Sequence, residues 1–279
     1  MRADGKKIKN ADPMYKVAAF VMKHRMDAMN MITVDIPYDP MHEYVKAKRA
    51  EGIIISHMAL VIAAYLRAAA EFPALNRFVV NKRIYARNEF CVGLVVLKSG
   101  DSGHGIMSKV YFDMEDTIFD VQRKIDEYIS KNRQTEENNS TEDLIDNLLS
   151  VPGLVNVGVG TFKMLDKYGL LPKKVIDASP FHASLLISNL ASIRTNHIYH
   201  HVYEFGTTSV ACTIGNLRVT PKLKGEQVVF ERTLPLGVVM DERICSGAYF
   251  AAVFKKVSTY LKNPTLLEVP PEKVIRDEV

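Results

Sequence analysis

The sequence predicts a single α/β domain. Strand-like and helix-like patterns alternate along the chain, which favours strands and helices packed around one core. No internal repeat divides the 279 residues, and 47% of them are hydrophobic, enough to build a substantial core. We therefore expect one domain over residues 1–279. We also expect a flexible, solvated tail at residues 1–12, where basic residues gather, and a mobile loop at polar residues 134–141.

The first third of the chain carries clear helix signals. Asp12-Pro13 and Asp39-Pro40 each place a capping residue before a proline, so both predict helix starts, and the second helix should end at Gly52. A strand is expected between them, at residues 28–36. Residues 56–71 repeat apolar side chains at helical spacing with alanines on the other faces, which predicts a helix packed on more than one side.

Strands dominate the rest of the chain. The expected strands are a hairpin over residues 78–86 that turns at Asn81-Lys82, then 90–98, 106–112, 184–190, 209–219 and 227–240. Helices are expected after Asp116-Thr117 and at residues 247–262, before Asn263-Pro264. Residues 144–176 are apolar and interrupted by proline and glycine, which predicts short helices at an edge or an interface.

Composition excludes several classes of protein. A net charge of +4 without a basic stripe argues against nucleic-acid binding. Cys91, Cys212 and Cys245 are isolated, so they predict neither a disulfide framework nor a metal site, and a cytoplasmic location follows. We expect no membrane span, because the longest uncharged stretch is interrupted by prolines and glycines and is too short.

Several motifs occur in the order found in one enzyme family. Their order and spacing agree, and Ser188 lies 54 residues before Glu242, close to the separation in that family. The motifs are Phe72-Pro73-Ala74-Leu75-Asn76, Ile187-Ser188-Asn189-Leu190, Asp241-Glu242-Arg243-Ile244-Cys245-Ser246-Gly247-Ala248 and Leu261-Lys262-Asn263-Pro264-Thr265-Leu266-Leu267. From residue 16 to residue 267 the chain resembles the catalytic domain of dihydrolipoamide acyltransferases from 2-oxo acid dehydrogenase complexes.

The resemblance implies a fold and an assembly. The fold is a two-layer α/β sandwich with a mixed sheet, as in chloramphenicol acetyltransferase, and the assembly is a homotrimer with active sites between subunits. Residues 144–176 are then expected at or near an interface. Coenzyme A or an acyl-coenzyme A is the implied substrate. The chain resembles neither a lipoyl nor a subunit-binding domain, so we expect no covalent lipoyl group.

The departures from the family pattern concern its catalytic groups. In the family the histidine of D-H-R-x-x-D-G deprotonates a thiol, the second aspartate orders the motif through the arginine, and a hydroxyl stabilises the oxyanion. This sequence has Glu242 at the histidine position and Ser246 at that aspartate position. The candidate catalytic residues are thus Glu242 and Ser188, with Asp241, Arg243, Ser246 and Gly247 as structural members of the motif.

Three interpretations of function stay open at this point. The first is a coenzyme A-dependent acyltransferase-family protein with weak or altered activity, because a carboxylate is a poorer base for a thiol than an imidazole. The second is a catalytically inactive trimeric scaffold or ligand-binding pseudoenzyme. The third is a partner that assembles with an active paralogue. His197, His200 or His201 could supply the missing base, although their spacing is weak evidence for this and is more typical of histidines in solvent or in the core.

Overall fold

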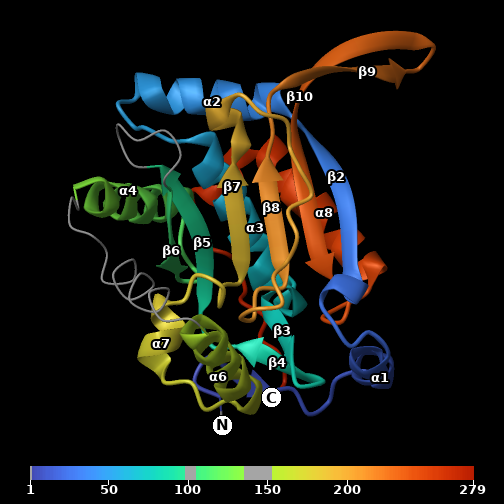
Figure 1. Cartoon of the computed structure of the whole chain (residues 1–279). Coiled ribbons are helices and arrows are strands. Elements are labelled where there is room, and N and C mark those ends of the chain that lie inside the picture. The colour runs from blue at the N-terminus through green and yellow to red at the C-terminus, as the bar shows by residue number, and fades with distance from the viewer. Residues whose placement is uncertain (1, 98–104, 135–152) are drawn as a thin grey trace.

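The computed structural model describes residues 2–97, 105–134 and 153–279. Seven strands form a mixed sheet in the order β2-β10-β8-β7-β5-β6, with β9 paired to β10 (Figure 1). A second sheet has the order β1-β4-β3. The strands are β1 (Gly5–Lys7), β2 (Met29–Pro37), β3 (Arg77–Val80), β4 (Arg83–Arg87), β5 (Phe90–Leu97), β6 (Gly105–Phe112), β7 (Leu185–Asn189), β8 (Val210–Ile214), β9 (Arg218–Lys224) and β10 (Gln227–Asp241).

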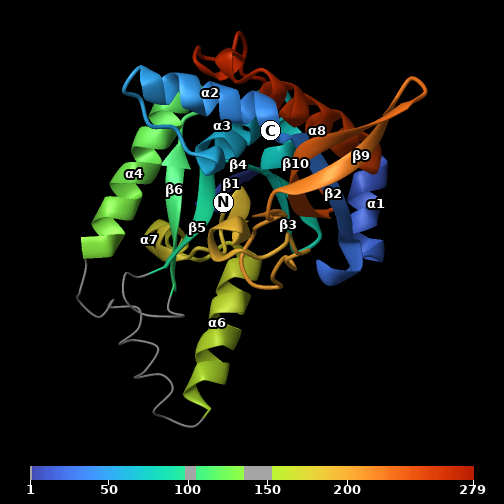
Figure 2. The same ribbon diagram turned by 90° about the horizontal axis from the view of Figure 1, so that it is seen from above.

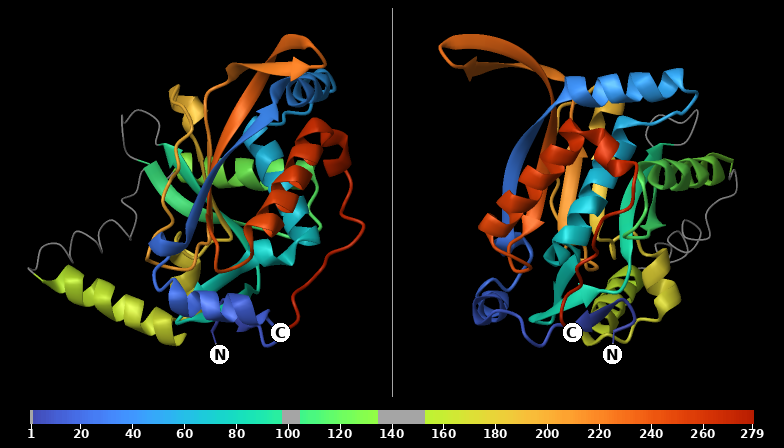
Figure 3. Two further views of the ribbon diagram at one scale, coloured as in Figure 1. Left: turned by 90° about the vertical axis from the view of Figure 1, so that its right-hand side faces the viewer. Right: turned by 180° about the vertical axis from the view of Figure 1, so that it is seen from behind.

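Helices cover one face of the large sheet, as the view from behind shows (Figure 3). The predicted two-layer α/β sandwich is therefore confirmed. The α-helices are α1 (Pro13–Val21), α2 (Tyr38–Ala50), α3 (His57–Glu71), α4 (Ile118–Gln134), α6 (Leu154–Tyr168), α7 (Lys173–Ala178) and α8 (Gly247–Lys262). Short 3-10 turns lie at Met26–Ala28, Pro73–Asn76, Leu190–Ile193 and Pro264–Leu267.

Helix α3 is the centre of the helical layer. The Ser56 side chain accepts a hydrogen bond of 3.1 Å from the Ala59 N–H, which caps the helix, and all residues from Ala59 to Ala70 are buried. The alanines allow neighbours to approach closely on every side. The expectation of a helix packed on more than one face is confirmed.

The predicted hairpin is formed by β3 and β4, which are joined by a turn at Asn81 and Lys82. Asn81 and Lys82 both have positive φ, as the two-residue turn between β3 and β4 requires. The predicted hairpin is therefore present.

The single strand expected at residues 209–219 is wrong, because β8 ends at Ile214 and β9 begins at Arg218. A Cβ on Gly215 would lie 2.2 Å from the backbone nitrogen of His197, so the chain leaves the sheet where another segment crosses it.

The expected solvated tail is wrong for the first described residues. Strand β1 pairs with β4, and Arg2 and Asp4 are buried. Arg2 donates to both oxygens of Asp4, and it also binds the backbone and side-chain oxygens of Asp166 on α6. Pairing with carboxylates compensates the desolvation of the guanidinium, and a basic residue can therefore be buried here.

Helix α6 projects from the body of the molecule (Figure 2). Its C-terminal half is anchored by Asp166, while Val157, Met164 and Tyr168 are 65%, 54% and 61% exposed. The expected loop at residues 134–141 and the start of the apolar segment at residues 144–176 lie outside the described residues, apart from Gln134, which ends α4. Among the described residues, no helix is long and apolar enough to cross a membrane.

Candidate functional site

Ser188 lies on the face of the sheet opposite the helices. In β7, Leu185 and Ile187 point into the helical core, while Leu186 belongs to a small apolar cluster on the other face. Strand alternation places Ser188 beside Leu186 on that second face. Ser188 is half-buried, and among the described residues its hydroxyl has no hydrogen-bond partner. Ser188 is therefore not an ordinary strand serine whose hydroxyl bonds to the backbone.

A row of small residues crosses the sheet from Ser188. Ser188 is in register with Thr213 of β8, Thr213 with Gly237 of β10, and Gly237 with Thr33 of β2. Residues 194–203, a segment without regular strands, pass over this row. The Thr213 hydroxyl holds that segment, because it accepts from the Ile198 N–H at 3.1 Å and donates to the Ile198 carbonyl oxygen at 2.5 Å.

Gly237 is needed for this crossing. A Cβ at this position would lie 2.4 Å from the Ile198 carbonyl oxygen and 3.0 Å from the His197 ring. The His197 ring therefore lies over Gly237, with Nε2 3.0 Å from the Thr33 hydroxyl oxygen and a buried Nδ1 that has no partner in the described structure. Tyr199 shares the same Thr33 hydroxyl at 2.6 Å.

The three candidate histidines do not converge. His200 and His201 stack on each other, with ring centroids 4.8 Å apart, and His200 Nδ1 lies 2.9 Å from the His201 carbonyl oxygen. His197 instead contacts Thr33. No group of three or more histidine, cysteine, aspartate or glutamate side chains among the described residues could hold a metal ion. Of the three, only the His197 ring lies over the row that begins at Ser188.

Asp241 and Arg243 form the rigid part of the motif. Asp241 is fully buried, and its two carboxylate oxygens accept from Arg243 Nε at 2.8 Å and Nη2 at 2.7 Å. Arg25 adds a second cation, with its Nε 3.5 Å from Asp241 Oδ2. Burial would lower the pKa of Arg243, but the hydrogen bonds and charge of Asp241 outweigh this and raise it.

Ser246 has a different role from the one that the resemblance implies for its position. Its hydroxyl accepts from the Tyr249 N–H at 3.2 Å and so caps α8, and its own N–H donates to the Tyr15 hydroxyl at 3.0 Å. Arg243 is ordered by Asp241 instead. We expected residue 246 to order the motif through Arg243, but the Asp241–Arg243 pair has this role in the structure. Gly247 is the first residue of α8.

Glu242 follows the end of β10 with a free carboxylate. Its N–H donates to the Ala28 carbonyl oxygen at 2.8 Å, and it is half-buried. Within the described residues, the carboxylate makes no hydrogen bond and no ion pair, not even with neighbouring Arg243. Glu242 therefore has a fixed backbone and an uncommitted side chain.

Register separates the two candidate catalytic residues within one chain. Glu242 follows Gly237 by five residues, and Gly237 lies two strands from Ser188 in the same row. At the usual spacings of a sheet, this is about 16 Å along the strands and about 10 Å across them. One copy of the chain does not bring Ser188 and Glu242 together.

Sequence reasoning missed two features of this part of the fold. Arg25 contacts Asp241 from a segment 216 residues away, and no local pattern marks it. A cavity of about 920 Å³ lies elsewhere, between the small sheet, β6 and the C-terminal segment; Pro73 and Asn76 are the motif residues that line it, and neither candidate catalytic residue does. It is therefore a separate feature from the row at Ser188.

Sequence comparison with known proteins matches only a short part of the chain. No family model matches the chain. Over 54 residues the chain is 43% identical to the dihydrolipoyllysine-residue acetyltransferase component of the acetoin cleaving system of Bacillus subtilis. That match spans 19% of this chain and only 14% of the relative.

Solved structures match over nearly the whole chain. A probable dihydrolipoamide acetyltransferase of Listeria monocytogenes has a TM-score of 0.59 at 15% identity, covering 92% of this chain and 94% of that one. The dihydrolipoamide acetyltransferase of Azotobacter vinelandii, studied for a serine, a histidine and an asparagine in its catalytic mechanism, has a TM-score of 0.62 at 12% identity, over 91% and 88%. A chloramphenicol acetyltransferase has 0.55 at 14%, over 92% and 99%. The chain therefore has the chloramphenicol acetyltransferase-like fold of dihydrolipoamide acetyltransferase catalytic domains.

Proposed function

We propose that this protein is an acyltransferase-family protein that binds coenzyme A or an acyl thioester between copies of the chain, with weak or altered transfer activity. One observation carries the proposal: Ser188 and Glu242 are both half-buried, and neither side chain has a partner among the described residues. Polar groups that a fold leaves unpaired in partly buried positions are commonly those that meet a ligand or another subunit.

Assembly of several copies of the chain would bring Ser188 of one copy close to Glu242 of another. Ser188 and Glu242 are far apart in one chain, so a shared site needs a second copy. The β9-β10 hairpin offers an apolar face for such contact: Val219, Leu223, Val228 and Phe230 are 62%, 73%, 60% and 73% exposed. Projecting helix α6 exposes further apolar side chains. We propose a homotrimer, in line with the family that the sequence resembles.

The chemistry follows from the two side chains. The Ser188 hydroxyl would donate a hydrogen bond to the oxyanion that forms when a thiol attacks a thioester carbonyl. Glu242 stands where the family has its thiol-deprotonating histidine, and a carboxylate is the weaker base for a thiol. Transfer should therefore be slow, or directed to an acceptor that needs less basic assistance.

An inactive scaffold or ligand-binding pseudoenzyme is the second candidate. The observation that favours it is that Asp241, Arg243 and Ser246 hold one another or α8, so the motif keeps its shape without chemistry. Binding of coenzyme A together with undetectable transfer would support this candidate.

Calorimetry with coenzyme A and acetyl-coenzyme A tests the proposal directly. We expect saturable binding by the wild type and weaker acetyl-coenzyme A binding by Ser188→Ala. Ser192→Ala is the matched control, because its hydroxyl is exposed and bonds only to the nearby Asn189 carbonyl oxygen. Light scattering should give three times the chain mass of 31.4 kDa. A monomer that binds neither compound would contradict the proposal.

A further inference from the structure

The cavity of about 920 Å³ lies at the edge of the small sheet, away from Ser188 and Glu242. Its walls come from β1, the start of β5, the end of β6 and the C-terminal segment around residues 274–279. That segment is fixed to the body, because the Ile275 N–H donates to the Ala70 carbonyl oxygen at 2.8 Å and Asp277 pairs with Arg77. The cavity is thus formed by docked parts of the chain.

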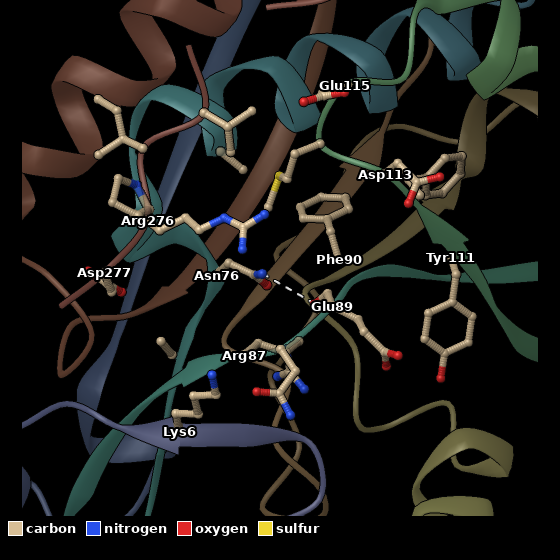
Figure 4. A pocket seen from close by; sticks show the side chains of 18 of the residues that line it. Lys6, Asn76, Arg87, Glu89, Phe90, Tyr111, Asp113, Glu115, Arg276 and Asp277 are labelled. Carbon is tan, nitrogen blue, oxygen red and sulfur yellow. Dashed lines mark hydrogen bonds between the residues drawn. The ribbon is translucent and has the colours of Figure 1, made fainter. Parts of the chain in front are cut away.

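Two cations face this cavity without a partner. Figure 4 shows the Arg276 guanidinium and the Lys6 amine directed into the space on either side of Asn76. Within the described residues, neither the Arg276 side chain nor the Lys6 side chain forms a hydrogen bond or an ion pair. The guanidinium of Arg87, which also lines the cavity, is instead bonded to Thr207. The charges of Arg276 and Lys6 are therefore available to a ligand.

Asn76 adds an unmet acceptor between these cations. It is only 7% exposed, and its Nδ2 donates to the Glu89 carbonyl oxygen at 3.3 Å. This bond fixes the orientation of the amide, since the reverse orientation would set two oxygens against each other. Its Oδ1 is buried and has no partner in the described structure. A buried acceptor in this state favours a ligand that carries a hydroxyl or amino donor.

One carboxylate, that of Asp277, lies at this corner beside Arg276, and it is paired with Arg77. Figure 4 places Asp113 and Glu115 at the end away from Lys6. Asp113 pairs with Lys124 at 3.0 Å, and Glu89 pairs with Lys173 at 2.7 Å. Phe90, Pro73 and Met114 contribute apolar surface to the cavity, and Figure 4 shows Phe90 between Arg276 and Asp113. A ligand could place its acidic group by Arg276 and its apolar body along this surface.

We propose that this cavity is a second ligand site, for a small organic acid with an apolar body and a hydroxyl or amino donor near its acidic group. The acid binds Arg276 and Lys6, the donor binds Asn76 Oδ1, and the apolar part contacts Phe90. This inference is independent of the proposed acyl site, because the two share no residue.

Three probes separate the contributions: phenyllactate has all the features, phenylpropionate lacks the hydroxyl, and phenylpropanediol lacks the acid. Calorimetry on the full chain should rank their affinities in that order, with a loss of about tenfold or more when the acid is removed. Arg276→Gln and Lys6→Gln should each weaken phenyllactate about tenfold. Lys273→Gln and Lys7→Gln are matched controls, because these cations lie on the same segments but do not line the cavity.

Two further measurements keep the result unambiguous. The melting temperature of Arg276→Gln should equal that of wild type, since the guanidinium has no partner to lose, and its affinity for coenzyme A should be unchanged. The proposal is overturned by any of three results. Phenyllactate does not bind, phenylpropanediol binds as tightly as phenyllactate, or the control variants lose as much affinity for phenyllactate as Arg276→Gln does. Failure of coenzyme A binding would affect only the proposed acyl site.

Discussion

Two sets of polar side chains in this fold differ in whether they have partners. One is the group of buried charges near the N-terminus, and the other is the pair of candidate site residues. Arg2, Asp4 and Asp166 are buried and bonded to one another. Ser188 and Glu242 are half-buried and have no partner in the described chain. The first arrangement holds α6 and β1 to the body, while we expect the second to contribute little to stability. Paired groups here serve the fold, and unpaired groups are available for function.

The largest effect should come from restoring the base. We expect Glu242→His to raise acetyl transfer from acetyl-coenzyme A to dihydrolipoamide by about 10²-fold to 10⁴-fold. Because Asp241 already orders Arg243, the further change Ser246→Asp should add little, since aspartate caps a helix about as well as serine. Thiol release measures the wild type, Glu242→His, Ser246→Asp and the double variant. A wild type that already turns over at about 1 to 10³ per second would instead implicate another base, with His197 as the first to test.

The next effect should be a loss of stability at Asp241. Asp241→Ala leaves buried Arg243 and Arg25 without their shared carboxylate, so we expect a loss of about 3 to 5 kcal/mol in the free energy of unfolding. Urea denaturation measures it. Glu242→Ala is the neighbouring control and should change stability by less than about 0.5 kcal/mol. Similar losses in both variants would remove the distinction between paired and unpaired groups.

A smaller effect is expected from pH at His182. Burial lowers the pKa of His182 from 6.5, and the nearby Asp166 carboxylate, 3.3 Å away, only partly opposes this. The unfolded chain therefore binds the proton more readily, so His182 contributes stability that is present above about pH 6.5 and is lost as pH falls through the lower folded pKa. Denaturation at pH 7.5 and pH 5.5 should show a steeper loss for wild type than for His182→Gln. Exposed His24→Gln should behave as wild type does.

The smallest effects separate two serines. Ser246→Ala removes the cap of α8 and should cost about 1 kcal/mol, whereas Ser188→Ala removes an unbonded hydroxyl and should change stability by less than about 0.5 kcal/mol. Thermal denaturation of the two variants in parallel measures the difference. If Ser188→Ala were the more destabilising, Ser188 would be a structural residue and the proposed site would lose its main support.

Local signals predicted most of the elements. Asp12 caps α1 just before Pro13, and the helix expected at residues 247–262 is α8. The hairpin at Asn81 and Lys82 is also present. These features depend on neighbours in sequence, where capping and turn preferences act. The resemblance supplied the sandwich that alternation alone could not specify, since alternation indicates only strands and helices.

Long-range pairing was the part that the sequence could not reveal. Nothing in the first few residues indicates that Arg2 will meet Asp166, so its charge predicted solvent. Likewise the sequence shows Ser246 only as the residue at the position of a motif aspartate, and its contact with the Tyr249 N–H, which makes it the cap of α8, depends on the fold. Whether Ser188 and Glu242 share a site depends on a second copy, and it stays a prediction.

The pairing of β10 has a consequence for biosynthesis. Ile36 of β2 is in register with Leu234, which follows it by 198 residues. During translation β2 therefore leaves the ribosome long before its partner exists, with an unpaired backbone and an apolar face. Contacts of such sequence separation slow folding and expose edges that can aggregate. The central sheet can close only after nearly all of the chain has been made, so a truncation before β10 should give an aggregating product rather than a smaller domain.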